Sequence, residues 1–258
     1  MPTITVAITG ASGAFGQALL RQWHRRGARL IALTHGGTPL VLRQVTGEVI
    51  PLEQVGWQVG QEAALGPILA AVDVLVINHG INPHGQRSAA ATEQALEVNA
   101  LSAWRLLELF AEVVRQRQAS ASVAGSSPSG AAGSSPGGEA PVARPRPEVW
   151  INTSEAEIQT AISPLYEISK RLIGQLLSLR ALDLADTLRL RRLVLGPFRS
   201  ALNPIGVMGA DWVAGQVLRQ ALDWNCALVI VTPNPLTYLL MPLTTLSRWA
   251  YFRLTSHP

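Results

Sequence analysis

Short apolar runs alternate with longer segments of helical period along this chain, and this alternation is the feature that most constrains its fold. Six such runs are expected to be strands buried on both faces, and a weaker seventh covers residues 48–52. The six runs are residues 4–8, 30–33, 74–77, 149–151, 190–195 and 228–231. The helical patterns between them cover residues 16–26, 92–118, 165–182 and 211–224. The alternation predicts an α/β fold, a doubly wound, Rossmann-like parallel sheet of about seven strands with helices on both faces.

The composition fits one domain with a sizeable core. Of the 258 residues, 48% are hydrophobic and only 15% are charged, against a usual charged fraction of about 25%. We therefore expect a single domain over residues 1–258. The net charge is +4, but the basic side chains form only short clusters at 25–26 and 189–192, without interleaved aromatic residues. Nucleic acid is therefore not an expected partner.

Cysteine usage and the first residues indicate the compartment. Cys226 is the only cysteine, which excludes a disulfide scaffold and a metal site built from several cysteines. A single thiol fits a reducing compartment, and the chain runs directly into its first expected strand without a charged leader. No run of about 18 apolar residues occurs, so no membrane span is expected. These observations predict a cytoplasmic protein.

Residues 119–147 differ from the rest of the chain because they are almost entirely Ala, Ser, Gly and Pro. Such a segment cannot bury enough apolar surface to offset its ordering entropy, so we expect a disordered, low-complexity insertion. It joins the end of the predicted helix 92–118 to the next strand, which places it at the amino edge of the sheet. Ligands of doubly wound folds bind at the opposite, carboxyl edge. A substrate lid is the alternative interpretation, and the location disfavours it.

A glycine-rich turn directly follows the first expected strand and opens the first expected helix. It reads Thr9-Gly-Ala-Ser-Gly-Ala-Phe-Gly16. Small residues at such a turn let the backbone approach a pyrophosphate and aim helix N–H groups at its charge. The turn therefore predicts a dinucleotide phosphate site formed by Gly10, Ser12, Gly13, Ala14, Phe15 and Gly16.

The tip of the second strand should contact the ribose that carries the adenine. An Asp or Glu there would accept a hydrogen bond from the 2′-hydroxyl of NAD and repel the 2′-phosphate of NADP. Thr34 and His35 stand at this position instead, and both side chains can donate to a phosphate. The sequence therefore favours NADP as the cofactor, with NAD as the alternative. No arginine stands beside them, and both are also compatible with an ordinary loop.

The fourth expected strand ends in Asn78, His79 and Gly80. Asn78 and Gly80 are expected to let the backbone pass close to the adenine. His79 has two interpretations: a metal ligand or base, and a loop histidine whose ring is hydrogen-bonded or solvated. His84 is its only nearby partner and no acids are suitably spaced, so no metal site is predicted.

Lys170 is the only lysine among the 21 Lys and Arg residues, and it follows Tyr166 by four positions. Residues four apart share a helix face, so the ammonium can approach the phenol ring. A nearby cation favours phenolate and lowers a tyrosine pKa that is normally about 10. A tyrosine tuned in this way can exchange a proton with an alcohol or a carbonyl. A surface pair without function is the alternative, but random placement gives such a pair with a frequency of only about one per cent.

Two further polar residues complete the candidate catalytic set. Ser154 ends the strand segment before the tyrosine helix, where its hydroxyl can bond a substrate oxygen as charge develops, and Thr153 is the second candidate. Asn99 lies within an apolar helical pattern, and a buried asparagine needs hydrogen-bond partners. We expect Asn99 to hold a kink and a water that relays protons to Lys170, although an ordinary polar position would give the same pattern.

Together these residues resemble the short-chain dehydrogenase/reductase family over nearly the whole chain outside 119–147. The resemblance rests on the glycine turn and on Asn78, Gly80, Asn99, Ser154, Tyr166, Lys170 and the segment 195–200. It implies NAD(P)-dependent hydride transfer with Tyr166 as acid/base and Lys170 lowering its pKa while holding the nicotinamide ribose. Ser154 would position the substrate oxygen, and Asn99 the water relay. The segment expected along the nicotinamide consists of Gly196, Pro197, Phe198 and Ser200.

The chain departs from the family pattern without losing a reacting group. The family's middle glycine is Ala14 here, and a leucine, Leu195, replaces the proline before the nicotinamide segment. Within the family, residues 78–80 and 196–204 are similar to those of chains labelled sterol desaturase/short-chain dehydrogenase. Five scattered histidines do not supply the iron boxes of a desaturase, so only dehydrogenase chemistry is expected.

The substrate is expected to meet two loops, 81–88 and 199–208. The second loop is apolar, which favours a small-molecule substrate with a hydrophobic or bulky carbonyl or alcohol, and packing of the loop on its own domain is the equal alternative. By family resemblance, helices 92–118 and 165–182 form the interface of a homodimer or homotetramer. The leading function is reversible alcohol/carbonyl oxidoreduction. Its rival is a binding module that holds a dinucleotide as a sensor or scaffold without turnover.

The tail, residues 236–258, is unusually apolar and aromatic. A rough helical stripe runs through Leu243, Leu246 and Trp249, and Arg248 and Arg253 flank it. Three interpretations follow: a helix docked on its own domain, which is the default, a peripheral contact with a membrane interface, and a subunit boundary. A structural role in a membrane-associated assembly would rest on this tail alone.

Overall fold

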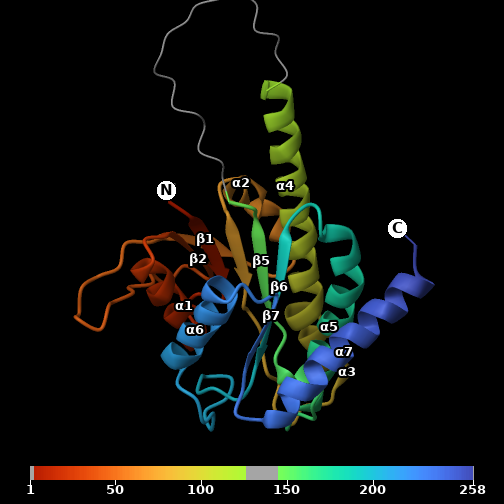
Figure 1. Ribbon diagram of the computed structural model, residues 1–258. Helices are drawn as coiled ribbons and strands as arrows, with labels where there is room; N and C mark the ends of the chain where they lie inside the picture. The colour runs from red at the N-terminus through yellow and green to blue at the C-terminus, as the bar shows by residue number, and fades with distance from the viewer. Residues whose placement is uncertain (1–2, 126–144, 258) are drawn as a thin grey trace, which may run out of the picture.

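The computed structural model describes residues 3–125 and 145–257, and its centre is a seven-stranded parallel sheet (Figure 1). The strands are β1 (Thr5–Thr9), β2 (Arg29–His35), β3 (Glu53–Trp57), β4 (Val74–Ile77), β5 (Glu148–Asn152), β6 (Arg189–Leu195) and β7 (Leu228–Val231). Their order across the sheet is β3-β2-β1-β4-β5-β6-β7, and each neighbouring pair is parallel. The predicted doubly wound, Rossmann-like fold is confirmed.

Helices cover both faces of the sheet. They are α1 (Ala14–Arg25), α2 (Gly66–Leu69), α3 (Ala89–Leu96), α4 (Ser102–Gly125), α5 (Pro164–Leu184), α6 (Ala210–Leu218) and α7 (Pro235–Thr255). Figure 1 shows α1 beside α6 on one face and α4 beside α5 on the other, while α7 packs against the outer side of α5. The carboxyl ends of the strands lie at the bottom of this view, where α7 also begins.

The core forms two apolar layers because successive side chains of a strand point to opposite faces. In β1, Val6 and Ile8 enter the layer under α1 and α6, while Ala7 enters the layer under α4 and α5. Trp23 and Trp150 meet in the first layer with ring centroids 5.3 Å apart. Because the strands are parallel and buried, the turns that follow them all lie at the carboxyl edge of the sheet.

The third strand lies five residues later than predicted. The apolar pattern at 48–52 forms no strand; Val49 makes only an isolated antiparallel bridge with Arg43. The strand that joins the sheet is β3, which pairs with β2 alone at the sheet edge. An edge strand keeps polar residues such as Glu53 on its surface, so it presents no continuous apolar run.

The helix predicted over residues 92–118 is three consecutive elements. A π-helical turn, Glu97–Leu101, separates α3 from α4. The π turn inserts an extra residue into the helix, and such turns are frequent at functional sites. The prediction of disorder from residue 119 is wrong for its first seven residues, because α4 continues to Gly125 and alanine is a strong helix former. Residues 126–144 of the predicted insertion lie outside the described residues.

The tail forms helix α7, in agreement with its expected helical stripe. Within the two described ranges, no helix combines the length and apolar character that crossing a bilayer requires.

Candidate active site

The glycine turn forms a cradle that only glycine can build at two positions. Gly10 has a φ of +62°, and a Cβ there would lie 3.0 Å from the His79 Cα. A Cβ on Gly16 would lie 2.3 Å from the Gly10 carbonyl oxygen. The turn leads into α1, whose N-cap Gly13 has no side-chain hydrogen bond and whose first turn carries no acid. Backbone N–H groups at this helix start therefore face an acid-free space, which fits the pyrophosphate of a dinucleotide.

An aromatic contact joins this cradle to the predicted nicotinamide segment. The rings of Phe15 and Phe198 lie 5.3 Å apart, so the turn after β1 meets the loop after β6. Gly196 packs so closely on β7 that an added Cβ would lie 2.3 Å from Thr232 Oγ1. Ser200 closes a small turn by accepting the Asn203 amide hydrogen bond at 3.2 Å. The fold thus brings the predicted phosphate and nicotinamide segments into contact with one another.

Of the two residues predicted to contact the ribose at the tip of β2, one is exposed and one is buried. Thr34 is buried, and its hydroxyl accepts a hydrogen bond from Gln54 Nε2 at 3.0 Å. His35 is exposed at the end of the strand. Of the two predicted donors, His35 is therefore the one whose side chain is placed to reach a ribose phosphate.

His79 is a hydrogen-bonded loop histidine in this structure. Its Nδ1 lies 2.9 Å from Thr9 Oγ1 and its Nε2 lies 3.2 Å from Ser102 Oγ. Ser102 uses its own proton to bond Glu62 Oε1 at 2.6 Å, so Nε2 is the nitrogen that donates to Ser102. Burial, aided by the Lys170 cation, lowers the pKa of His79 to about 3. The ring is therefore neutral and structural. It bonds Thr9 Oγ1, which also accepts the Asn78 amide at 2.8 Å, directly before Gly10.

The predicted catalytic side chains meet at the start of α5. The Ser154 hydroxyl lies close enough to Tyr166 to influence the phenol pKa, and it donates a hydrogen bond to the Leu195 carbonyl at 3.3 Å. Lys170 Nζ lies 5.6 Å from the centroid of the Tyr166 ring. Lys170 is 4% exposed and donates to the Asn152 carbonyl oxygen at 2.9 Å. Thr153, the second candidate, is fully buried with its hydroxyl on the Leu193 carbonyl at 3.5 Å. Ser154 is thus the serine or threonine of this strand end that contacts the tyrosine.

The electrostatics of this group differ from the expectation. Burial raises the pKa of the Tyr166 phenol, and the hydrogen bond with Ser154 acts in the opposite direction. The net direction in the free chain is therefore a raised pKa, and the lowering of this pKa by Lys170, whose ammonium donates to the Asn152 carbonyl, stays a prediction. Burial instead lowers the pKa of Lys170 itself to about 8, with Glu157 opposing the shift. Of Tyr166 and Lys170, the lysine is therefore the residue that titrates closer to neutral pH.

Asn99 lies in the π turn, as the expected kink requires. Its Oδ1 accepts the Ile81 amide at 2.8 Å, and its Nδ2 donates to the Ile81 carbonyl and to Ser169 Oγ, each at 3.0 Å. The amide therefore clamps the loop after β4 against α5. That Asn99 also holds a water that relays protons to Lys170 remains a prediction.

Asn152 is a site residue that sequence reasoning missed. Its Nδ2 donates to Asn78 Oδ1 at 3.0 Å, and its carbonyl receives the Lys170 ammonium. Its Oδ1 is buried without a hydrogen-bond partner. An unpaired acceptor at the carboxyl ends of β4 and β5 suits a hydroxyl-rich ligand such as a ribose. The available signal was its position, a polar residue directly before Thr153 and Ser154 at a strand end.

A buried ionic cluster behind α5 was also missed. Glu157 Oε1 accepts from Arg192 at 2.9 Å and from Arg248 of α7. A Cβ on Gly174 of α5 would lie 2.2 Å from the Glu157 carboxyl carbon, so glycine makes room for this carboxylate. The cluster fixes α5 relative to β6 and α7.

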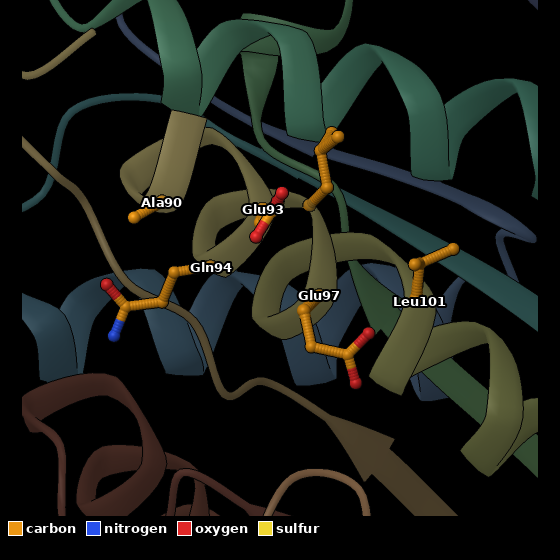
Figure 2. Close-up of a pocket in the computed structure, with 6 residues that line it drawn as sticks. Ala90, Glu93, Gln94, Glu97 and Leu101 are labelled. Atoms are coloured by element: carbon orange, nitrogen blue, oxygen red, sulfur yellow. The ribbon is translucent and has the colours of Figure 1, made fainter. Parts of the chain in front are cut away.

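A separate surface depression of about 560 Å³ lies over α3 and the π turn (Figure 2). Its lining includes Glu93, Gln94, Glu97 and Leu101 and none of the predicted site residues. Among the described residues, no three His, Cys, Asp or Glu side chains lie close enough to hold a metal ion.

The strand order and the glycine cradle on β1 define a Rossmann-type class of dinucleotide-binding folds. The model of the NAD dependent epimerase/dehydratase family matches residues 6–177, and the chain belongs to that family. The family match confirms the expected dependence on a nicotinamide dinucleotide.

A curated relative lies within the same class. The monoglucosyldiacylglycerol epimerase of Synechocystis sp. is 41% identical over 248 residues, which are 96% of this chain and 54% of that protein. The chain therefore spans about half the length of this relative.

Solved structures share the fold. The bulky-bulky ketone specific alcohol dehydrogenase from Comamonas testosteroni has a TM-score of 0.70 at 15% identity, over 100% of this chain and 98% of that one. A short-chain dehydrogenase from Sphingobium yanoikuyae in complex with NADPH has a TM-score of 0.68 at 16% identity, over 97% and 95%. The resemblance to short-chain dehydrogenases/reductases is confirmed.

Proposed function

We propose that this chain is an epimerase that reversibly oxidises one hydroxyl-bearing carbon of a glycosyl headgroup on a lipid. The observation that carries the proposal is the grouping of Tyr166 and Ser154 with the buried Lys170 at the carboxyl edge of the sheet. The Synechocystis relative, named for epimerisation of a monoglucosyldiacylglycerol, aligns with 96% of this chain and supports both reaction and substrate class.

Tyr166 is the acid/base in this proposal. Because burial raises its pKa, the phenol is protonated in the free chain and can donate its proton to a carbonyl oxygen. In the reverse direction it receives the hydroxyl proton of the alcohol. Ser154 donates a hydrogen bond to the same substrate oxygen, and the Lys170 ammonium offsets negative charge that develops there.

The dinucleotide, when bound, supplies the acceptor and the donor of the hydride. Residues of the glycine cradle would hold its pyrophosphate, the open Oδ1 of Asn152 would accept from a ribose hydroxyl, and the segment from Gly196 to Ser200 would lie along the nicotinamide. NADP is the favoured form because His35 is exposed at the tip of β2 with no carboxylate beside it.

Epimerisation differs from net oxidation in what leaves the site. For the oxidation step Tyr166 must first have released its proton to solvent; the phenolate then accepts the O–H proton, while the C–H hydrogen would leave with its electron pair to the dinucleotide. Inversion of the stereocentre requires the keto sugar to turn over within the site, so that the dinucleotide would return the hydride to the opposite face while Tyr166 donates the proton to the oxygen. Protons and electrons balance within the site. The reaction therefore needs only catalytic amounts of dinucleotide.

The test is an assay with detergent-dispersed monoglucosyldiacylglycerol and substoichiometric NADP or NAD, in which the released sugar is identified by chromatography. We expect an epimer without net accumulation of reduced dinucleotide. Tyr166→Phe should lower turnover by about 10³-fold, since it removes the proton that is transferred. The control Tyr251→Phe removes the same atom from an exposed tyrosine and should leave turnover unchanged.

Two other results would contradict the proposal. Stoichiometric reduced dinucleotide with a keto product would indicate a dehydrogenase instead. Dinucleotide binding, followed by quenching of tryptophan fluorescence, without turnover in either direction would indicate the binding module. The same titration should show tighter binding of NADPH than of NADH.

A further inference from the structure

Helix α7 presents its faces in the reverse of the usual order. Thr237 and Met241 are fully buried on its inner face, and Arg248 bonds the buried Glu157 from the same side. Thr237 also donates to Glu155 at 3.2 Å. The inner stripe is therefore largely polar and is held by specific bonds. A helix of a soluble domain normally turns its apolar stripe to the core.

The opposite face of α7 is apolar and exposed. We call this set the α7 outer surface: Leu236, Leu239, Leu243, Leu246, Trp249 and Leu254, which are 47–82% exposed. At 100° per residue, Leu239, Leu243 and Leu246 lie within about 60° of one another and opposite the buried pair. Because the inner face is fixed by Glu155 and Glu157, the helix cannot roll to hide these leucines.

The charges near this surface indicate what covers it. Residues 224–258 contain no Asp or Glu, and their arginines are Arg248 and Arg253. Arg253 is exposed with its guanidinium over the Trp249 ring, 5.7 Å from the centroid. Leucines with a tryptophan and a cation, and no acid, match helices that lie in the interface of anionic membranes. In a symmetric dimer through α7, the two copies would supply cations and no acid to pair with them.

Exposed apolar side chains continue along the edge where the candidate site opens. Ile162 is 89%, Ile205 is 76% and Val207 is 71% exposed. The loop before α5 contacts the start of α7 through Gln159 Nε2 and Thr237 Oγ1 at 3.4 Å. Figure 1 places the loop after β6 and the first turn of α7 at this same end of the molecule.

We propose that the α7 outer surface docks on an anionic lipid bilayer, with the carboxyl edge of the sheet facing the lipid. The helix lies in the plane of the headgroups, and its docked inner face orients the domain. A glycosyl headgroup then enters the site without its lipid leaving the membrane; this last step rests on the proposed function.

The experiment is cosedimentation of the full chain with vesicles of phosphatidylcholine, with and without phosphatidylglycerol. We expect binding to the anionic vesicles and weaker binding to the neutral ones. The double substitution Leu243→Gln/Leu246→Gln should lower the partition coefficient by about tenfold or more, because two leucines no longer enter the interface. Arg253→Gln should reduce the preference for anionic vesicles.

The matched control is Val41→Gln/Val45→Gln, which changes two exposed valines remote from α7 and should bind like the unchanged chain. Equal loss in this control, or no binding to either vesicle, would overturn the proposal. So would a lipid-free dimer in sedimentation velocity that the double leucine substitution dissociates. Tyr166→Phe should still bind vesicles, so a loss of turnover and a loss of docking can be told apart.

Discussion

Helices α5 and α7 are equal in length, and each begins with a proline, yet they use their faces in opposite ways. Both have 21 residues, and they pack against one another. α5 turns Ser169 and Lys170 inward, where burial sets their chemistry. α7 turns leucines outward and keeps a polar stripe inside. Length and starting residue do not distinguish them; the direction of their polar residues does.

The difference shows how burial assigns a role to a helix. A polar side chain in the interior needs a partner, and at α5 Lys170 donates to the Asn152 carbonyl while Ser169 accepts from Asn99. An exposed patch of apolar side chains is unfavourable in water, and such patches commonly mark a surface that binds a membrane or a partner. In our proposals α5 therefore carries the reacting side chains and α7 docks on the membrane, and the cluster around Glu157 connects the two helices.

The largest expected effect separates the two helices by function. Lys170→Met should lower turnover by about 10³-fold, because the buried ammonium beside Tyr166 and the substrate is lost. Vesicle binding through α7 should remain. The control Arg171→Met removes a neighbouring, half-exposed cation of α5 that pairs with Glu167, and should retain turnover. If both variants lose activity equally, charge on α5 rather than Lys170 itself is responsible.

The next effect tests the joint between the helices. Gly174→Ala places a Cβ 2.2 Å from the Glu157 carboxyl carbon, and should reduce the free energy of unfolding by about 3 kcal/mol. Urea denaturation measures it. Gly215→Ala in α6 is the matched helical control, since its Cβ meets nothing closer than 3.5 Å, and it should be neutral or slightly stabilising. A harmless Gly174→Ala would mean that the cluster does not fix α5 against α7.

The smallest effect is a pH dependence confined to α5. Because the pKa of Lys170 is lowered to about 8, kcat/KM that needs its ammonium should fall about tenfold per pH unit above that value. Stability should move the other way: between about pH 8 and 10.5 the unfolded chain binds the extra proton, so the Lys170 contribution to the free energy of unfolding rises with pH. Lys170→Met should remove this contribution. Vesicle binding should stay constant over the same range, since arginine remains charged.

Local patterns predicted most of the fold. Strands buried on both faces, such as β4 and β7, have apolar runs whose predicted and observed bounds coincide. The edge strand β3 and the end of α4 were misplaced, because an edge strand needs no apolar run and an alanine- and serine-rich segment can extend a helix.

The site divides along a different line. Tyr166, Lys170 and Ser154 could be predicted because their spacing lies within one strand and one helix. Asn152 and Glu157 could not, since their roles depend on Asn78 and Arg248, residues 74 and 91 positions away in the chain. The direction of the Tyr166 pKa shift could not be predicted from the sequence either, because burial of the phenol in the folded chain is its largest cause.

The backbone of Ser154 has a consequence for anyone who engineers this protein. Its φ of 71° and ψ of 156° belong to a region that is natural for glycine and costs other residues about 1–3 kcal/mol. A search for heat resistance alone would therefore select glycine at this position. Under the proposed function, such a variant would gain stability and lose turnover, because glycine has no hydroxyl to bond the substrate oxygen.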